Sequence, residues 1–321
     1  MFIFASKYNI CIMKNKLKRS AIALLIIALF SNGITHAQSS KNDLTELGLK
    51  GKVKSKIEKT IKPGNAVNFD GNQYIFDVNG NTIECIFYEN RIAVKKIDNQ
   101  YNGAGNKIAQ ELYDRAGSLS ETDSFKYDKK GNMTASTSYD KNKSVIRKDT
   151  LKYNEAGNKV EDRAYGKGGV LLSVTAYKYD EKGNNTEVAS ADKTGSLFSK
   201  EVNIYKYNNK GKLIENSSAN KDGVLSWKYT YGYDDDGNAT ESKGSTYDKD
   251  GKLVSSNSSK FDEKGNVSEY YVYGPDGGAK SKEVYKYDAK GNKSTATKYN
   301  MQSGKPELEA TSYIMIDYFK E

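Results

Sequence analysis

One short motif recurs along most of this chain and constrains its fold more than any other feature. It consists of an aromatic residue, Asp or Asn, two variable residues, Gly and often Asn. From Tyr101 to Ala191 the steps between copies alternate between 12 and 14 residues, so the repeating unit has 26 residues and two motifs. A degenerate early copy begins at Phe76. Clear copies begin at Tyr101, Tyr113, Tyr127, Tyr153, Tyr179, Tyr207, Tyr233, Tyr247, Phe261 and Tyr287, and weaker ones at Tyr139, Tyr165, Ala191, Ala219 and Tyr273.

Each copy has the chemistry of a tight turn. The Asp or Asn side chain can accept hydrogen bonds from backbone N–H groups two residues on, and the Gly permits a positive φ. Together they predict a four- or five-residue hairpin loop built on a type I turn and closed by a left-handed Gly. Segments of 6–10 residues rich in Tyr, Thr, Val and Ser separate the turns and show no helical period. We therefore predict an all-β fold: a tandem array of antiparallel β-hairpins forming a thin meander sheet or an open spiral shell.

One predicted strand carries a row of large side chains. Residues of one parity share one face of a strand, and here that row is Leu225, Trp227, Tyr229, Tyr231 and Tyr233. Aromatic residues make up 11% of the chain and there are 3 Pro, which indicates an ordered chain rather than a disordered one. The hydrophobic fraction of 36% includes 25 Tyr, so we expect a thin core.

The N-terminus has the three parts of a secretory signal peptide. A basic stretch at residues 14–19 precedes an apolar run at residues 21–30, and Thr35-His36-Ala37 has small residues where signal peptidase requires them. The apolar run is about half the ~20 residues that a membrane-spanning helix needs. We expect cleavage after Ala37, no transmembrane segment afterwards, and a secreted, periplasmic or cell-surface location. Met13 is an alternative start.

The predicted organisation has four parts. Residues 1–37 are the signal peptide, 38–75 form N-terminal capping strands, 76–305 form the hairpin repeats, and 306–321 form a C-terminal capping strand. Repeat arrays need atypical ends for solubility. The strand-like segments 49–55 and 312–319 are therefore expected to cover the two exposed edges of the sheet.

The motif copies resemble the YD/RHS-type repeat family over about residues 76–305. The chain also resembles short secreted YD-repeat proteins of Bacteroidetes-type bacteria, which open with a strand like its residues 49–55. The resemblance implies a spiralling β-shell and a link with carbohydrate or cell-surface binding. Larger members carry toxin cargo. Here we find no long domain after the repeats and no signature of a self-cleaving end, so the resemblance implies a binding or structural array without a toxin domain.

The residues available for chemistry argue against an enzyme. The one His, His36, and Cys11 lie in the expected signal peptide, which leaves Cys85 without an imidazole base for nucleophilic catalysis. Glu residues recur four positions after the turn Gly, with the parity of the aromatic face. Paired carboxylates hydrolyse glycosides, but such pairs need distinct environments, so identical repeated carboxylates indicate a structural ladder. The recurring residues are Glu161, Glu187, Glu215, Glu241 and Glu269.

Two charged patterns have structural interpretations. Acidic turns at 234–237 and 248–251 resemble fragments of calcium loops, but the twelfth position counted from Asp248 is Ser259 rather than the Glu of an EF-hand. We predict no metal and no cofactor. Removing residues 1–37 takes away five basic and no acidic residues, so the formal charge falls from +9 to +4 and no nucleic-acid partner is expected. A row of lysines before the turn Gly suits edge protection: Lys130, Lys182, Lys210, Lys264 and Lys290.

The aromatic face is the best candidate for ligand contact. Sugars stack on aromatic rings while polar groups hold their hydroxyls, although the same rings also stabilise a thin sheet. We expect a non-catalytic module that binds cell-surface or envelope glycans. The alternative is a purely structural or protein–protein interaction scaffold at the cell envelope. The predicted ligand-binding residues are Trp227, Tyr229, Tyr231, Tyr233, Glu241 and Glu269.

Overall fold

The computed structural model describes residues 42–65 and 68–320. This part of the chain contains helix α1 (Asp43–Glu46), the 3-10 turn η1 (Lys167–Gly169) and twenty antiparallel strands. The expected signal peptide and Met13 lie outside the described residues. The strands are β1 (Val53–Ile61), β2 (Asp70–Phe76), β3 (Thr82–Glu89), β4 (Ile92–Tyr101), β5 (Lys107–Tyr113), β6 (Leu119–Tyr127), β7 (Met133–Asp140), β8 (Val145–Tyr153), β9 (Lys159–Gly166), β10 (Leu171–Tyr179), β11 (Asn185–Asp192), β12 (Leu197–Tyr207), β13 (Leu213–Asn220), β14 (Leu225–Tyr233), β15 (Ala239–Tyr247), β16 (Leu253–Phe261), β17 (Val267–Tyr273), β18 (Ala279–Tyr287), β19 (Lys293–Asn300) and β20 (Glu307–Tyr318).

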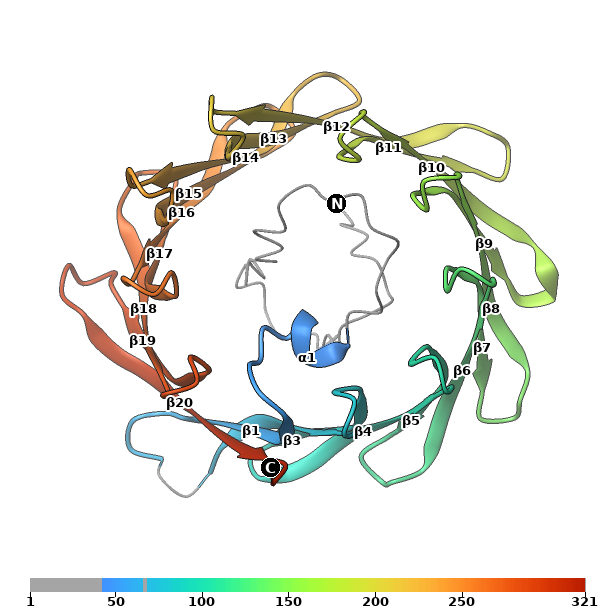
Figure 1. The fold of residues 1–321 in the computed structure, drawn as a ribbon, viewed down its shortest axis with the longest axis horizontal. Coiled ribbons are helices and arrows are strands. Elements are labelled where there is room, and N and C mark those ends of the chain that lie inside the picture. Colours follow the sequence, from blue (N-terminus) through green and yellow to red (C-terminus); the bar gives the residue numbers. More distant parts are fainter. Residues whose placement is uncertain (1–41, 66–67, 321) are drawn as a thin grey trace.

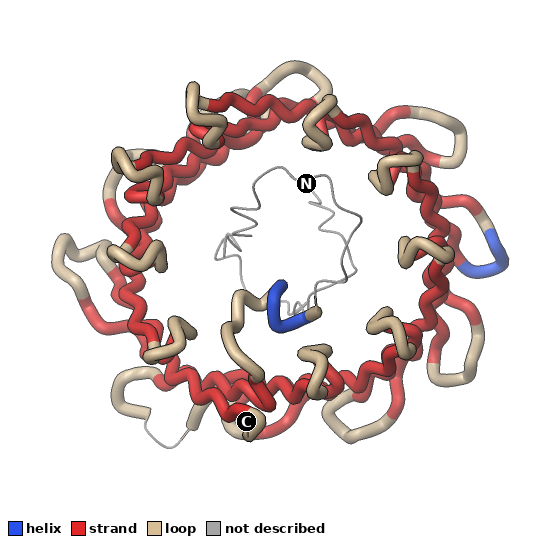
Figure 2. The backbone as a smooth tube through the Cα atoms, viewed as in Figure 1, coloured by secondary structure: helices blue, strands red, loops and turns tan. Residues whose placement is uncertain are grey.

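The strands close into a barrel (Figures 1 and 2). Each strand pairs with the next along the chain, and β20 pairs with β1 from Val53↔Tyr318 to Ile61↔Thr311. The predicted antiparallel hairpin array is confirmed, but the open sheet or spiral is wrong. The two terminal segments were expected to cover separate edges, whereas they pair with each other. Closure gives β1 and β20 a hydrogen-bonded neighbour on both sides, which removes the unpaired edges that an open sheet would expose.

The motif copies form the turns as predicted. After β6, Asp128 Oδ1 accepts hydrogen bonds from the backbone N–H groups of Lys130 and Asn132, both at 2.9 Å. Gly131 N–H donates to the Asp128 carbonyl at 3.1 Å, and Gly131 has a φ of 84°. One weak copy has Lys143 where the others have Gly, and Lys143 adopts a φ of 62°. The turn geometry thus follows from local side-chain chemistry.

A register shift accompanies the turns of the repeats. In the β10–β11 hairpin Lys178 pairs with Glu187, but Tyr179 pairs with Asn185, so the turn-proximal end of β11 accommodates one extra residue. One extra residue moves every following side chain to the other face. A face assigned from parity in one strand therefore does not carry across the turn into the next strand.

The connections between strands form two sets at opposite ends of the barrel. Figure 2 shows one set inside the ring and the other outside it. We call the first set the inner-rim turns and the remaining connections the outer-rim loops. α1 lies at the inner rim, where Asn42 Nδ2 donates to the carbonyl of Asn79 at 2.7 Å. The inner-rim turns are residues 77–81, 102–106, 128–132, 154–158, 180–184, 208–212, 234–238, 262–266 and 288–292.

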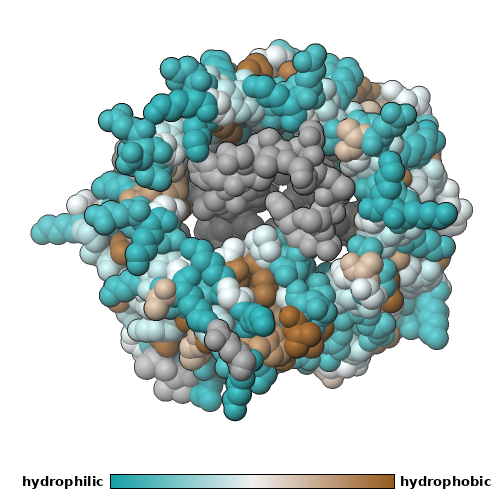
Figure 3. Space-filling view, in the orientation of Figure 1, coloured by the Kyte–Doolittle hydropathy of each residue, from teal (hydrophilic) through white to brown (hydrophobic). Residues whose placement is uncertain are grey.

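Apolar packing is densest where α1 meets the first strands. Figure 3 shows apolar residues gathered there on a face that is otherwise largely hydrophilic. Along the repeats the wall is a single sheet, so few large apolar side chains are buried, in agreement with the expected thin core. The buried cluster comprises Leu44, Val53, Tyr74, Phe76, Cys85, Phe87 and Ile97.

Candidate functional site in the barrel interior

Strand register identifies the residues that face the barrel interior. α1 lies inside the ring (Figure 1), and it lines a cavity together with Ile97 and Asn99 of β4. Residues directly opposite each other on antiparallel strands share a face. This orientation therefore carries from strand to strand around the wall, and it places Trp227 and Tyr229 of β14 on the interior face.

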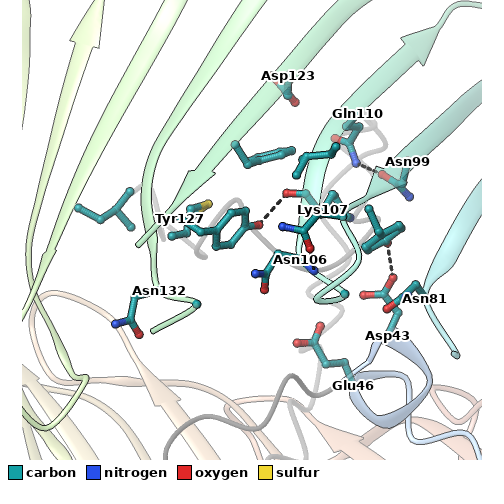
Figure 4. Close-up of a pocket in the computed structure, with 18 of the residues that line it drawn as sticks. Asp43, Glu46, Asn81, Asn99, Asn106, Lys107, Gln110, Asp123, Tyr127 and Asn132 are labelled. Atoms are coloured by element: carbon teal, nitrogen blue, oxygen red, sulfur yellow. Dashed lines mark hydrogen bonds between the residues drawn. The ribbon is translucent and has the colours of Figure 1, made fainter. Parts of the chain in front are cut away.

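The cavity occupies about 1400 Å³ between α1 and the inner wall (Figure 4). Its lining is polar near the inner rim. Asp43 of α1 accepts hydrogen bonds from Tyr101 Oη and from the Thr82 backbone N–H, each at 2.7 Å. Deeper in, Gln110 Nε2 donates to Asn99 Oδ1 at 2.8 Å. α1 is thus fixed on the interior face by both hydrogen bonds and apolar packing.

The barrel wall that lines this cavity together with α1 carries charged side chains. We call the interior-facing residues of β4–β9 the charged wall. Arg147 donates two hydrogen bonds to Asp149, Nε to Oδ2 at 2.8 Å and Nη2 to Oδ1 at 2.7 Å, and the Asp149 side chain is 3% exposed. Asp123 also faces this space. Asp162, opposite Leu151, has its pKa raised by burial.

The predicted aromatic row lies on the interior face of β14. The rings of Trp227 and Tyr229 are tilted against each other with centroids 5.8 Å apart. Tyr229 covers the backbone of Gly244 on β15, where a Cβ atom would collide with the ring. Because one side of this ring rests on the wall and the side chain is only half-buried, an aromatic surface remains open to the interior.

The four predicted rings differ in how they are held. Tyr231 Oη donates to Asn216 Oδ1 at 3.0 Å, and burial raises the pKa of Tyr231 to about 12. Tyr233 Oη donates to the Leu213 carbonyl at 2.7 Å. Within the described part of the chain, the hydroxyl of Tyr229 makes no such hydrogen bond. The strip that can meet a ligand is therefore centred on Trp227 and Tyr229.

The bond made by Tyr233 is a repeated device. Tyrosines before several inner-rim turns donate to the carbonyl 20 residues earlier, which lies at the start of a strand in the preceding inner-rim hairpin. These tyrosines thus tie adjacent hairpins together, which gives them a structural role; five of them are motif aromatics, and Tyr205 stands two residues before the motif aromatic Tyr207. The bonds are Tyr127–Lys107, Tyr153–Met133, Tyr179–Lys159, Tyr205–Asn185, Tyr233–Leu213 and Tyr287–Val267.

The recurring glutamates do not share the aromatic face, contrary to the prediction. Glu241 lies opposite Gly232, whose neighbours in β14 are the interior-facing tyrosines, so Glu241 faces outward. It pairs with Lys243 at 2.9 Å. Glu269 is held by Lys282 at 2.6 Å and Lys260 at 3.3 Å, and the hydrogen bond from Lys282 lowers the pKa of Glu269. The register shift at each turn is the reason, because it reverses parity between successive strands.

The acidic turns behave as turn elements. Asp234 Oδ1 accepts from the Asn238 backbone N–H at 2.7 Å, and Asp248 Oδ1 accepts from the N–H groups of Asp250 and Lys252, both at 2.9 Å. Among residues 42–65 and 68–320 no group of three or more His, Cys, Asp or Glu could hold a metal ion. The same part of the chain has no helix long and apolar enough to cross a membrane.

Sequence reasoning missed the residues that surround the aromatic strip. Asn216 and Ser218 of β13, Gly244 of β15 and Asn257 of β16 share its face. Ser and Asn recur in most of the strands, so no local pattern distinguishes these residues. Only the register across three turns, each with its shift, brings them beside Trp227.

Comparisons with known proteins give fold similarity alone. No protein-family profile matches the sequence, and no curated protein matches it. The chain is similar to a chain in the crystal structure of TcdB2-TccC3-Cdc42 (TM-score 0.30, 11% identity); the match covers 80% of this chain and 16% of the other, so this chain spans only a small part of that protein's length. It is also similar to porin-like proteins from Bacteroides uniformis (TM-score 0.37) and Bacteroides vulgatus (TM-score 0.30), each with 10% identity over 84% of this chain and 99% of the other. These TM-scores lie below 0.5, and the similarities support no statement about ligands.

Proposed function

We propose that this protein is a non-catalytic binding module for cell-surface or envelope glycans, and that the glycan lies against the aromatic strip on the interior face of β14. The observation that carries the proposal is the arrangement of Trp227 and Tyr229, whose half-buried rings face the barrel interior, with the Tyr229 ring lying over Gly244. Sugar rings present C–H faces that pack on aromatic faces. Their hydroxyls can exchange hydrogen bonds with Ser and Asn side chains nearby.

The barrel shape supports the same proposal. A barrel of this strand number encloses more space than its own side chains fill, and the cavity beside α1 is one part of that space. The expected signal peptide would deliver the chain to a secreted, periplasmic or cell-surface location, where such glycans occur. We further propose that the chain is a short YD/RHS-type repeat protein, since its motif copies form every hairpin turn from β4 to β19.

The test is glycan binding by the purified exported protein. A glycan array and envelope polysaccharides are probed with the wild type and with the double variant Trp227→Ser/Tyr229→Ser. The matched control is Tyr271→Ser/Tyr273→Ser, which removes a stacked aromatic pair (6.1 Å between centroids) from the outward face of β17. Binding lost in the first variant and kept in the second supports the proposal. Binding that survives the first variant, with circular dichroism unchanged, refutes the aromatic site.

A structural or protein–protein scaffold is the second candidate, favoured by exposed apolar side chains at the outer-rim ends of two strands. Val170, Leu172, Leu197 and Phe198 are 46–53% exposed and lie at the ends of β10 and β12. Exposed apolar groups of this kind suit contact with a second copy of the chain. Sedimentation velocity of the wild type and of Leu172→Ser/Phe198→Ser tests it: self-association that disappears in the variant, without glycan binding, favours the scaffold.

A further inference from the structure

The interior face of the barrel is uncharged over one continuous sector, from β13 to β17. We call the interior-facing residues of these five strands the uncharged wall. Every one of them is Ser, Thr, Asn, Gly, or an apolar or aromatic residue. The sector is flanked by Glu201 on β12, opposite Asn220, and by Glu283 on β18, opposite Tyr270.

The charged residues of these five strands all face outward, and each of them is in an ion pair. The pairs join neighbouring strands or neighbouring positions on the outer surface, at distances of 2.6–3.3 Å. Alternation along the strands therefore separates charge from the interior completely in this sector. The six residues are Glu215, Lys228, Glu241, Lys243, Lys260 and Glu269.

Buried polar atoms without hydrogen-bond partners gather in the same sector. Six such side-chain atoms occur in the described part of the chain, and three of them, Ser218 Oγ, Asn257 Oδ1 and Ser259 Oγ, belong to the uncharged wall. Ser218 lies opposite Trp227, and Asn257 lies opposite Gly244, beside the ring of Tyr229. These side chains are 0–7% exposed. An unpaired buried polar group is destabilising, and a ligand group that pairs with it recovers this loss.

The chemistry of this wall selects a ligand by charge. A hydroxyl both donates and accepts, so it can pair with a Ser hydroxyl or with the Asn257 carbonyl oxygen. A carboxylate, phosphate or ammonium group placed here would lose water and meet no countercharge, which is costly. Resting on the function proposed above, we infer that the ligand of the aromatic strip is an uncharged glycan, a neutral polyhydroxyl chain that stacks on Trp227 and Tyr229.

The experiment compares glycans that differ only in charge. Isothermal titration uses the wild-type protein with dextran, a β-glucan, a mannan and a galactan, each alongside its carboxymethylated derivative, at low and high salt. We expect binding to at least one neutral polymer and at least tenfold weaker binding to its derivative. The loss should persist at high salt, because it arises from desolvation rather than from long-range repulsion.

A charge-insertion variant sharpens the result. Thr246 faces the interior opposite Trp227 and is half-buried, so Thr246→Lys places an ammonium group at the edge of the site. This variant should regain affinity for the carboxymethylated polymer and lose affinity for the neutral one. The Trp227→Ser/Tyr229→Ser variant, which does not depend on Thr246→Lys folding, should lose the neutral polymer.

The outcomes separate the two levels of the proposal. Equal or tighter binding of the carboxymethylated polymers by the wild type, abolished in Trp227→Ser/Tyr229→Ser, overturns the uncharged-ligand inference and leaves glycan binding standing. Absence of binding to every polymer and to the array overturns glycan binding itself, and the inference with it.

Discussion

The charged wall and the uncharged wall are built from the same repeat, yet they present opposite chemistries to the interior. Both have the same turns, and both carry the tyrosine bond to the preceding hairpin, made by Tyr127 on one side and Tyr233 on the other. The charged wall keeps the Arg147–Asp149 pair inside the barrel, whereas the charges of β13–β17 all lie outside. The motif therefore determines the backbone conformation of the turns. The residues at the interior-facing positions between motifs determine the chemistry that each wall presents to the interior.

The difference also concerns how each wall is stabilised. On the charged wall the buried carboxylate of Asp149 is paired with Arg147, although Asp123 Oδ1 has no hydrogen-bond partner there. On the uncharged wall aromatic rings lie over small residues, as Tyr229 lies over Gly244, and several buried polar atoms have no partner. A satisfied network rigidifies a wall, while unpaired groups beside an aromatic surface suit a ligand.

Raising the pH should have the largest effect, and it acts on both walls. Burial raises the pKa of Tyr127 and Tyr153 on the charged wall, and of Tyr231 and Tyr270 on the uncharged wall, to about 12. The unfolded chain ionises its tyrosines near pH 10. Stability is thus fully present below pH 10 and is lost as the pH rises toward 12. Denaturant unfolding at stepped pH, with tyrosinate absorbance, measures this; stability that is constant up to pH 12 would contradict it.

The Asp149→Ala variant should be the most destabilising single change on the charged wall. It leaves the Arg147 guanidinium without its carboxylate, and breaking a buried pair costs about 3–5 kcal/mol. We expect the lower end of this range, because the Arg147 side chain is 33% exposed. The control is Asn257→Ala on the uncharged wall, whose Oδ1 has no partner to lose. Urea unfolding compares the two; equal losses would mean that the walls do not differ in this way.

Gly244→Ala should disturb the uncharged wall. The new Cβ would collide with Tyr229 and with the Asn257 amide, and such overpacking costs about 1–3 kcal/mol. Displacement of the Tyr229 ring should also weaken glycan binding. Gly232→Ala is the matched control: Gly232 lies on the neighbouring strand and faces outward, and the nearest contact of the new Cβ would be the side-chain atom Thr240 Oγ1 at 3.3 Å. Thermal unfolding and titration should show little change in the control, and a Gly244→Ala protein with wild-type stability would refute the packing argument.

The two walls should respond equally when the tyrosine bonds between hairpins are removed. Tyr127→Phe and Tyr233→Phe each delete one hydroxyl that donates to a backbone carbonyl at 2.7 Å. Each should lower the free energy of unfolding by about 0.5–1.5 kcal/mol. Chemical denaturation of both variants measures the losses. A large loss in one and none in the other would show that the repeat is not structurally equivalent on the two walls.

The smallest effect is expected outside the barrel, at Glu241→Gln. Its ion pair with Lys243 has side chains 45% and 61% exposed, and exposed pairs contribute about 0–1 kcal/mol. Stability and glycan binding should both stay close to wild type. Loss of binding in a folded Glu241→Gln protein would restore Glu241 to the ligand site and contradict its outward placement.

The sequence determines the local structure of this protein. The Asp or Asn and the Gly of each motif fix the turn through bonds within five residues, as between Asp128 and Asn132, so every reversal of the repeats is readable in advance. Within a single strand the alternation of side chains is equally local, and the shared face of Trp227, Tyr229, Tyr231 and Tyr233 is confirmed by their pairing with β15.

Tertiary structure decides closure and the composition of the site. Closure depends on the summed geometry of twenty strands, which brings β1 beside β20 although their paired residues are more than 240 positions apart in sequence, as the hydrogen bond between the hydroxyls of Thr60 and Ser312 shows. The site depends on register shifts at successive turns, which turned Glu241 and Glu269 outward and brought Ser218, Gly244 and Asn257 inward. A one-residue bulge is too small a signal to read from the sequence, yet it exchanges the two faces of the next strand.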